Sequence, residues 1–198
     1  MHTEIEAKWL DINLATMRKQ LLNIGAKLIA KERLMVREVY DYPDNRLNKI
    51  GGWVRVRNEG DKITLSYKQL IDRTVNGTKE VNVVVDDFES TCSFLRSIGL
   101  KSKSFQETKR ESWKLGDTEI ELDTWPWIPS FIEIEAQNEN ELISVANKLN
   151  LDYSLALHGS VETAYQAVYD VTDEEIDQWE EIRFTEVPDW LTLKSKKF

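Results

Sequence analysis

Seven short segments of the sequence alternate between polar and apolar residues with a period of two. This period places successive side chains on opposite faces of a β-strand, so each segment predicts a strand with one polar and one apolar face. An eighth strand is predicted where β-branched and aromatic residues are frequent but the alternation is less regular. The eight predicted strands cover residues 3–9, 33–42, 53–57, 63–68, 80–85, 105–113, 119–123 and 132–135.

The polar faces of these strands carry charges of both signs. Glutamate and aspartate are depleted in strands, so their frequency here requires an explanation. One interpretation is that the charged face is the solvated side of an open antiparallel sheet. The other is that the strands close into a barrel, helices cover its apolar outside and the charges line its interior. The charged positions are Glu4, Glu6, Lys8, Arg55, Arg57, Lys68, Glu80, Arg110, Glu119, Glu121, Asp123, Glu133 and Glu135.

Helical spacing of apolar residues predicts helices at 11–23, 87–97 and 139–149, and two further helices at 161–169 and 173–182. Together with the strands, they indicate an α+β fold, an eight-stranded antiparallel β-barrel with a charged lumen and helices packed outside. A chain of 198 residues can bury one core. We therefore expect one domain, with the barrel in residues 1–170 and a helical extension and tail in 171–198, of which the part after residue 182 is predicted to be frayed.

Charge and hydropathy argue against several classes of function. The net charge of −9 disfavours a protein that coats nucleic acid, because such binding needs surplus lysine and arginine. No apolar run approaches the roughly 20 residues that cross a bilayer, and the first residues lack the features of a secretory signal. We therefore expect a cytoplasmic protein without a membrane partner, either monomeric or homodimeric. Cys92 is the single cysteine and is predicted to be a buried thiol.

Charges that converge in an enclosed lumen need partners, because desolvating an unpaired ion is costly. Carboxylates two residues apart on one strand can present oxygen atoms to one Mg²⁺ or Mn²⁺ ion. The sequence has two such pairs, Glu4 with Glu6 and Glu133 with Glu135. Lysine and arginine are natural partners of phosphate oxygens. A small molecule with a chain of phosphates, bridged by metal, would satisfy both sets of side chains.

The segment from Glu4 to Lys8 resembles the ExExK signature of the CYTH superfamily, the triphosphate tunnel metalloenzymes. Later elements follow in the family order: Trp53-Val-Arg55-Val-Arg57, Lys68, Glu80, Arg110, Asp123 and Glu133-Ile-Glu135. The resemblance extends from Thr3 to about Tyr169. It implies an eight-stranded antiparallel tunnel whose lumen holds a triphosphate and metal. The family comprises inorganic triphosphatases, thiamine triphosphatases and class IV adenylyl cyclases.

Carried over position by position, the resemblance implies roles for the charged residues. The implied metal ligands are Glu4, Glu6, Asp123, Glu133 and Glu135, and the implied phosphate-binding residues are Lys8, Arg55, Arg57, Lys68 and Arg110. Among these bases, Lys8, Arg57 and Lys68 are expected to be catalytic. Three further residues are candidates for the site: Glu80, Glu121 and Tyr40.

Two positions depart from the family pattern. Glu38 replaces the aspartate of the family's Asp-x-Tyr strand, which leaves the role of Tyr40 open. Thr108 stands where many relatives have a lysine, so one phosphate contact is either missing or supplied from elsewhere.

Three other features have a structural and a functional interpretation. The segment 125–129, with two tryptophans and two prolines, is expected to be a rigid apolar plug between barrel and helix, although its indoles could stack on a base or thiazole ring. The acidic run 173–181 is expected to be a solvated helix. His2 and His158 lack metal-ligand spacing and are expected to be structural or surface residues.

The function expected from the resemblance is metal-dependent hydrolysis of tripolyphosphate, thiamine triphosphate or a nucleoside triphosphate inside the tunnel. One alternative is a class IV adenylyl cyclase that makes cyclic AMP from ATP. A second alternative is a non-catalytic module that binds nucleotide or polyphosphate. The acid set disfavours the last, because a pure anion binder gains nothing from metal ligands that face its bases.

Overall fold

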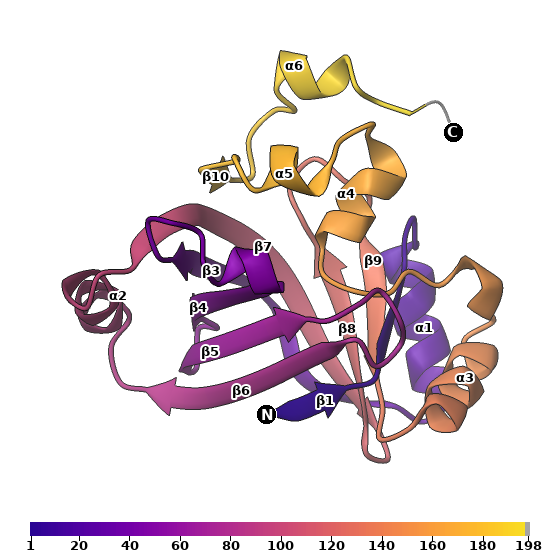
Figure 1. The fold of residues 1–198 in the computed structure, drawn as a ribbon. Helices are drawn as coiled ribbons and strands as arrows, with labels where there is room; N and C mark the ends of the chain where they lie inside the picture. Colours follow the sequence, from indigo (N-terminus) through magenta and orange to yellow (C-terminus); the bar gives the residue numbers. More distant parts are fainter. Residues whose placement is uncertain (197–198) are drawn as a thin grey trace.

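The computed structural model describes residues 1–196 of the chain. Antiparallel strands form a nearly closed barrel, and helices pack on its outside (Figure 1). The strands are β1 (His2–Glu4), β2 (Glu6–Trp9), β3 (Lys27–Asp41), β4 (Gly52–Asn58), β5 (Ile63–Leu70), β6 (Thr78–Val85), β7 (Lys101–Leu115), β8 (Thr118–Thr124), β9 (Phe131–Glu135) and β10 (Glu181–Ile182). The predicted α+β barrel fold is therefore confirmed.

The N-terminal segment joins the two edges of the sheet. Neighbouring strands follow the order β1-β6-β5-β4-β3-β7-β8-β9-β2, and only Ile5 separates β1 from β2 in the sequence. One strand was predicted over residues 3–9, but it is interrupted at Ile5, so β1 pairs with β6 and β2 pairs with β9. This interruption accounts for nine strands around the barrel instead of eight. The tenth strand, β10, pairs in parallel with β7.

The helices agree with most of the predicted positions. They are α1 (Leu14–Asn23), α2 (Phe88–Ser97), α3 (Glu139–Lys148), α4 (Glu162–Val168), α5 (Asp173–Ile176) and α6 (Asp189–Thr192), with short 3₁₀ turns at Asn48–Ile50 and Tyr153–Leu155. The side chains of Asn13, Asp87 and Asn138 accept hydrogen bonds from backbone amides in the first turns of α1, α2 and α3. Such N-caps satisfy amides that lack a partner within the helix, which explains where these helices begin.

The C-terminal region differs from the prediction. The helix expected at 173–182 ends with α5 at Ile176, and β10 begins at Glu181. The residues after the predicted helix are not frayed up to Lys196, since α6 buries Leu191 and the amide of Lys196 donates to the carbonyl of Val168. Residues 197–198 of the predicted frayed tail lie outside the described residues.

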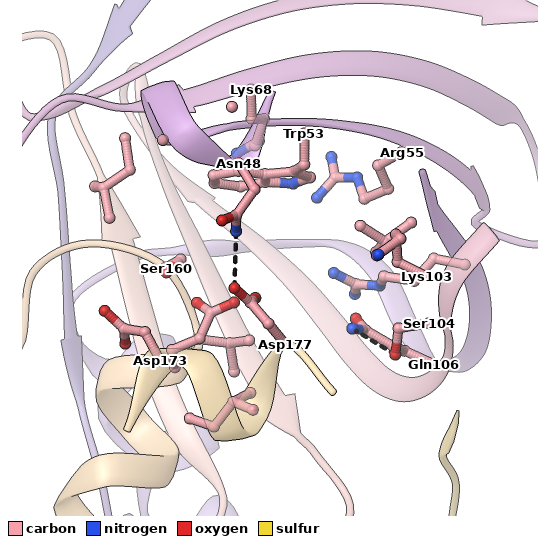
Figure 2. Close-up of a pocket in the computed structure, with 18 of the residues that line it drawn as sticks. Asn48, Trp53, Arg55, Lys68, Lys103, Ser104, Gln106, Ser160, Asp173 and Asp177 are labelled. Carbon is pink, nitrogen blue, oxygen red and sulfur yellow. Dashed lines mark hydrogen bonds between the residues drawn. The ribbon is translucent and has the colours of Figure 1, made fainter. Parts of the chain in front are cut away.

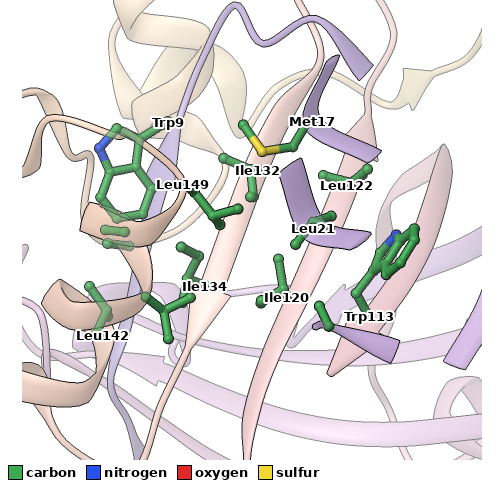
Figure 3. Close-up of a cluster of buried hydrophobic side chains, with 14 of the residues drawn as sticks. Trp9, Met17, Leu21, Trp113, Ile120, Leu122, Ile132, Ile134, Leu142 and Leu149 are labelled. Carbon is green, nitrogen blue, oxygen red and sulfur yellow. The ribbon is translucent and has the colours of Figure 1, made fainter. Parts of the chain in front are cut away.

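The apolar faces of β8 and β9 point outward and are covered by helices. Ile120, Ile132 and Ile134 of β8 and β9 pack against Leu21 of α1 and Leu142 of α3 (Figure 3). This packing places the alternate, charged side chains of the same strands on the inner face. It therefore excludes the open sheet with a solvated charged face.

Two smaller clusters cover further parts of the barrel, whereas the outward-facing Val81 and Val83 of β6 are exposed. Cys92 of α2 packs with Tyr40 of β3 and Val56 of β4, and burial raises the pKa of its thiol to about 12. The segment 125–129 packs against the C-terminal helices, where Trp125 and Trp127 contact Tyr165 and Trp179, but Trp125 also lines the central cavity, so the alternative of stacking on a ligand stays open. No helix within residues 1–196 is long and apolar enough to span a membrane.

Candidate active site

Strand register brings the predicted site residues together on the inner face of the barrel. Three pairs lie directly opposite each other on neighbouring strands: Glu6 and Glu135, Lys8 and Glu133, and Lys68 and Glu80. Four of these six residues, Glu6, Lys8, Lys68 and Glu133, line a cavity of about 530 Å³, a size typical of small-molecule sites, whereas Glu80 and Glu135 are not among its lining residues. All five predicted phosphate-binding residues line this cavity: Lys8, Arg55, Arg57, Lys68 and Arg110. Figure 2 shows Lys68, Trp53 and Arg55 on one wall.

Glu133 of β9 joins two of the predicted bases. One of its carboxylate oxygens lies 3.1 Å from Nη2 of Arg110, and the other lies 3.1 Å from Nζ of Lys8. Arg110 also forms two parallel bonds to Asp123, of 2.7 and 2.5 Å. Burial opposes ionisation of Glu133, but Lys8 and Arg110 hold its pKa below the usual range. This side of the cavity is thus a compact network of fixed charges.

The ammonium group of Lys8 already has three acceptors. It donates to Glu6 at 3.0 Å and to the carbonyl of Gly159 at 2.8 Å, in addition to its contact with Glu133. The residue is 3% exposed. Burial opposes its charge, yet Glu133 and Glu6 raise its pKa above the ordinary value. A phosphate would therefore have to displace one of these acceptors to reach Lys8.

On the opposite wall, Lys68 connects two acids. Its Nζ lies 2.9 and 3.0 Å from the carboxylate oxygens of Glu4 and 3.6 Å from Glu80, which also binds Arg55 at 3.2 Å. Burial raises the pKa of Glu4 to about 8, and neighbouring carboxylates contribute to this although Lys68 opposes it. Burial and the neighbouring arginines lower the pKa of Arg55 to about 9. The pKa values of Glu4 and Arg55 are therefore sensitive to the charge of any molecule bound in the cavity.

Two acids on the inner face lack close partners. Burial, Glu6 and Glu133 raise the pKa of Glu135 to about 7, and no base within residues 1–196 forms an ion pair with it. Burial also raises the pKa of Glu121 to about 7, although Arg110 lies 4.0 Å away, and one of its oxygens is buried without a hydrogen bond. This wall holds more negative charge than its bases neutralise, which a bound cation would relieve.

These acids fit a hard divalent cation in chemistry, since they offer only carboxylate oxygens. Within residues 1–196, however, no three histidine, cysteine or carboxylate side chains are arranged as a ready set of metal ligands. Lysine and arginine groups hold Glu4, Glu6, Asp123 and Glu133 in ion pairs instead. The metal-ligand roles of these residues and of Glu135 therefore stay predictions.

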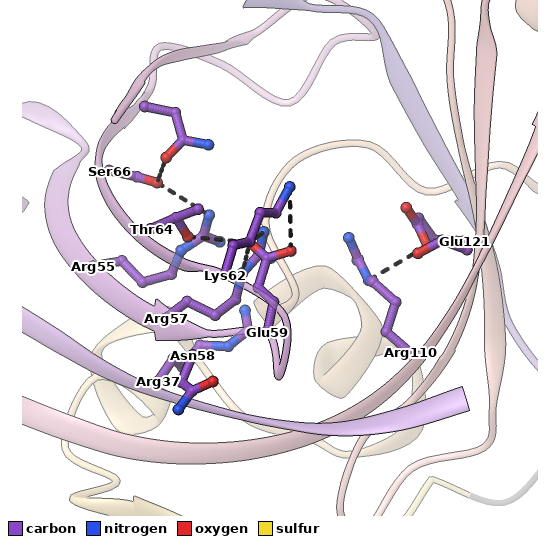
Figure 4. Close-up of polar contacts among 12 residues, drawn as sticks. Arg37, Arg55, Arg57, Asn58, Glu59, Lys62, Thr64, Ser66, Arg110 and Glu121 are labelled. Atoms are coloured by element: carbon purple, nitrogen blue, oxygen red, sulfur yellow. Dashed lines mark hydrogen bonds and ion pairs between the residues drawn. The ribbon is translucent and has the colours of Figure 1, made fainter. Parts of the chain in front are cut away.

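Glu59 is a buried acid that the sequence interpretation missed. Its Oε1 accepts bonds from Nε and Nη2 of Arg57, at 3.0 and 2.7 Å, and from the hydroxyl of Thr64 at 3.1 Å (Figure 4). Burial opposes its charge, but Arg57 keeps its pKa below the ordinary value. Glu59 follows the end of β4, where the alternating pattern has stopped, so only its position two residues after Arg57 could have indicated it.

Arg37 of β3 is the second residue that was missed. It lies opposite Arg57 on β4 and Gln106 on β7 and lines the cavity. The inward-facing positions of β3 also include Met35 and Val39, so the strand shows no polar stripe. Arg37 and Asp41 are four residues apart and therefore lie on the same face of β3, and Asp41 is also buried. This shared face was the sequence feature that could have indicated Arg37.

Tyr40 lies on the other face of β3. It is opposite Val54 and packs against α2, and its hydroxyl group contacts Glu38 and accepts a bond of 3.1 Å from Arg96. The hydroxyl of this candidate is therefore bonded on the outer face, away from the predicted bases.

The mouth of the cavity includes residues from the acidic run. Asp177 accepts a bond of 2.7 Å from Asn48, and Asp173 binds Arg73 at 2.6 Å. Asp173, Glu174 and Asp177 all line the cavity, and Figure 2 shows Asp173 and Asp177 facing it from α5 and the residue after it. Asp173, Glu174 and Glu175 are exposed, as expected of a solvated helix, but the helix ends at Ile176 and the run also lies at the mouth of the cavity.

Comparison with known proteins identifies the family of this barrel. A sequence model of the CYTH domain matches residues 2–164. The chain belongs to the CYTH family. No curated protein gave a match to this CYTH chain.

Solved structures share the CYTH fold at low sequence identity. A putative adenylate cyclase from Vibrio parahaemolyticus is 16% identical with a TM-score of 0.71, over 83% of this chain and 98% of that chain. The PH1012 protein from Pyrococcus horikoshii is 23% identical with a TM-score of 0.64, over 77% and 93%. A putative adenylyl cyclase from Hippeastrum, described as having a dominant triphosphatase activity, is 14% identical with a TM-score of 0.58, over 83% and 95%.

Proposed function

We propose that this CYTH protein hydrolyses a phosphoanhydride bond of a triphosphate compound with the help of a divalent cation. The observation that carries the proposal is the cavity in which arginine and lysine side chains from β2, β4, β5 and β7 meet carboxylates from β2, β8 and β9. A single phosphate would leave most of these bases without an anion. A chain of phosphates can contact several of them at once.

The arginine and lysine residues that line the cavity would bind and orient the phosphates. Arg57 and Arg110 are each held by a carboxylate and retain further N–H groups for phosphate oxygens. Lys68 can exchange Glu4 for a phosphate oxygen, since both accept from the same ammonium group. Such fixed positive charge stabilises the negative charge that spreads over a transferred phosphoryl group.

A bound divalent cation would supply Lewis acid chemistry and charge neutralisation at the phosphates. Glu4, Glu6, Asp123, Glu133 and Glu135 are the residues proposed to hold it. When ligand phosphates take the basic partners of these acids, the carboxylates lose their counter-charges. The acids are then free for a cation, so phosphate and cation should bind cooperatively.

Product analysis tests the proposal. The purified protein is incubated with tripolyphosphate, thiamine triphosphate or ATP, each with Mg²⁺ or Mn²⁺ and each with excess chelator. We expect orthophosphate from at least one substrate, and its release should stop with chelator. Cyclic AMP with pyrophosphate would support the cyclase instead, and tight binding without turnover of any substrate would support the non-catalytic module.

A further inference from the structure

Each arginine on the inner wall is compensated by a carboxylate, with one exception. Arg55 pairs with Glu80 at 3.2 Å, Arg57 with Glu59 at 2.7 Å and Arg110 with Asp123 at 2.5 Å, whereas within residues 1–196 Arg37 forms no ion pair. Arg37 is nevertheless 6% exposed. Among the described residues, it is thus a buried arginine of the inner wall without an ion-pair partner, and Asp123 offsets its charge only from a distance.

The contacts of Arg37 hold its guanidinium group without neutralising it. Nη2 donates to the hydroxyl of Thr108 at 3.0 Å, and the guanidinium carbon lies 4.6 Å from the centre of the Trp125 ring. Nε is buried and has no hydrogen-bond partner within residues 1–196, which is also true of Nε of Arg55. Most buried polar groups are hydrogen-bonded, so an unpaired buried N–H next to a cavity points to a missing ligand.

Electrostatics support the same conclusion. Burial lowers the pKa of Arg37 well below the ordinary value, and the charges of Arg55, Arg57 and Arg110 lower it further. The ligand-free protein is therefore destabilised by this side chain. An anion in the cavity would remove that penalty and gain a charge-assisted hydrogen bond.

We propose that Arg37 binds a phosphate oxygen of the polyphosphate ligand, and that Thr108 and Trp125 position its guanidinium group for this contact. The inference rests on the proposed function for the class of the ligand. At position 108 of β7, many relatives have a lysine and this chain has a threonine. Arg37 of the neighbouring strand β3 supplies a positive charge next to this position.

The test compares ligand binding with stability in the absence of ligand. Arg37→Gln should weaken binding of tripolyphosphate in the presence of Mg²⁺ roughly 10- to 100-fold, measured by calorimetry, since it removes a charged hydrogen bond. The same variant, without ligand, should unfold in urea at the same concentration as the wild type or at a higher one. A structural arginine would instead lose stability when it is replaced.

Arg183→Gln is the matched control. The guanidinium carbon of Arg183 lies 4.1 Å from the centre of the Phe105 ring, but on the outer surface and paired with Glu181 and Glu107. This variant should bind tripolyphosphate as the wild type does.

The double variant Arg37→Gln/Thr108→Lys should recover part of the lost affinity, because the ammonium group of the new lysine can reach the space that the arginine leaves.

Three results would overturn the inference. They are unchanged affinity in Arg37→Gln, loss of both affinity and stability in that variant, and no binding of tripolyphosphate by the wild type. The last result would also contradict the proposed function for this substrate. If the wild type hydrolyses tripolyphosphate and Arg37→Gln binds and turns it over equally well, the role of Arg37 fails while the proposed function stands.

Discussion

Replacing Glu135 by glutamine should stabilise the ligand-free protein at pH 8 and have little effect at pH 5. The reason is that Glu135 lies opposite Glu6 on one side and Glu119 on the other, with no base within residues 1–196 in an ion pair with it. Burial and its acidic neighbours raise its pKa from 4.5 to about 7. Ionising this carboxyl group in the folded protein is therefore unfavourable.

The sign and size of the effect follow from this pKa. Between pH 4.5 and about 7 the folded protein holds the Glu135 proton while the unfolded chain has released it, so stability falls as the pH rises through this window. At about 1.4 kcal/mol per pKa unit, this interval of about 2.5 units corresponds to at most about 3.5 kcal/mol at pH 8. Water in the tunnel reduces this figure. Glutamine carries no charge at any pH and avoids the loss.

Urea unfolding at pH 5, 6.5 and 8 measures the effect. Glu186→Gln serves as a control, because Glu186 is exposed and lies away from the cavity. We expect the stability difference between Glu135→Gln and the wild type to be small at pH 5, about a quarter of its value at pH 8, and to grow between these two pH values. A difference independent of pH, or a variant less stable than the wild type at pH 8, would refute the reasoning.

Three further predictions concern other parts of the chain. Arg57→Ala and Glu4→Gln should each lower the turnover of the preferred triphosphate by about 100-fold or more, with an unchanged circular dichroism spectrum; retention of most activity would contradict their assignment. Trp125→Ala should lower the free energy of unfolding by about 3 to 5 kcal/mol, since its buried ring packs on Tyr165. Asp87→Ala should cost about 1 kcal/mol in the same urea assay, because it removes the N-cap of α2.

Strict alternation made the barrel and most of its inner face predictable from sequence. Arg55 and Arg57 alternate with Val54 and Val56, and this parity places both arginines inside the barrel. The same reasoning holds for Glu133 of β9. Alternation shows on which face of a strand each side chain lies, and it can be recognised from neighbouring residues in the sequence.

The residues that were missed depend on information that is not local. Arg37 faces inward on a strand whose inner positions mix polar and apolar side chains, because Met35 fills part of the barrel interior. The pairing of Arg57 with Glu59 depends on the geometry of the turn after β4. The place of Asp177 at the cavity mouth depends on how the C-terminal segment packs, which no periodicity encodes.

The interruption of the first strand at Ile5 links folding order to chemistry. Residues 2–9 pair with β6 and β9, strands that lie about 75 and 125 residues further along the chain. Bringing together segments so distant is slow, because chain entropy is lost before contacts form. The same short segment carries Glu4, Glu6 and Lys8. If residues 2–9 have not yet paired with β6 and β9, the inner face of the barrel also lacks these three charged side chains. All charged residues of the pocket are therefore in place only when the barrel is closed.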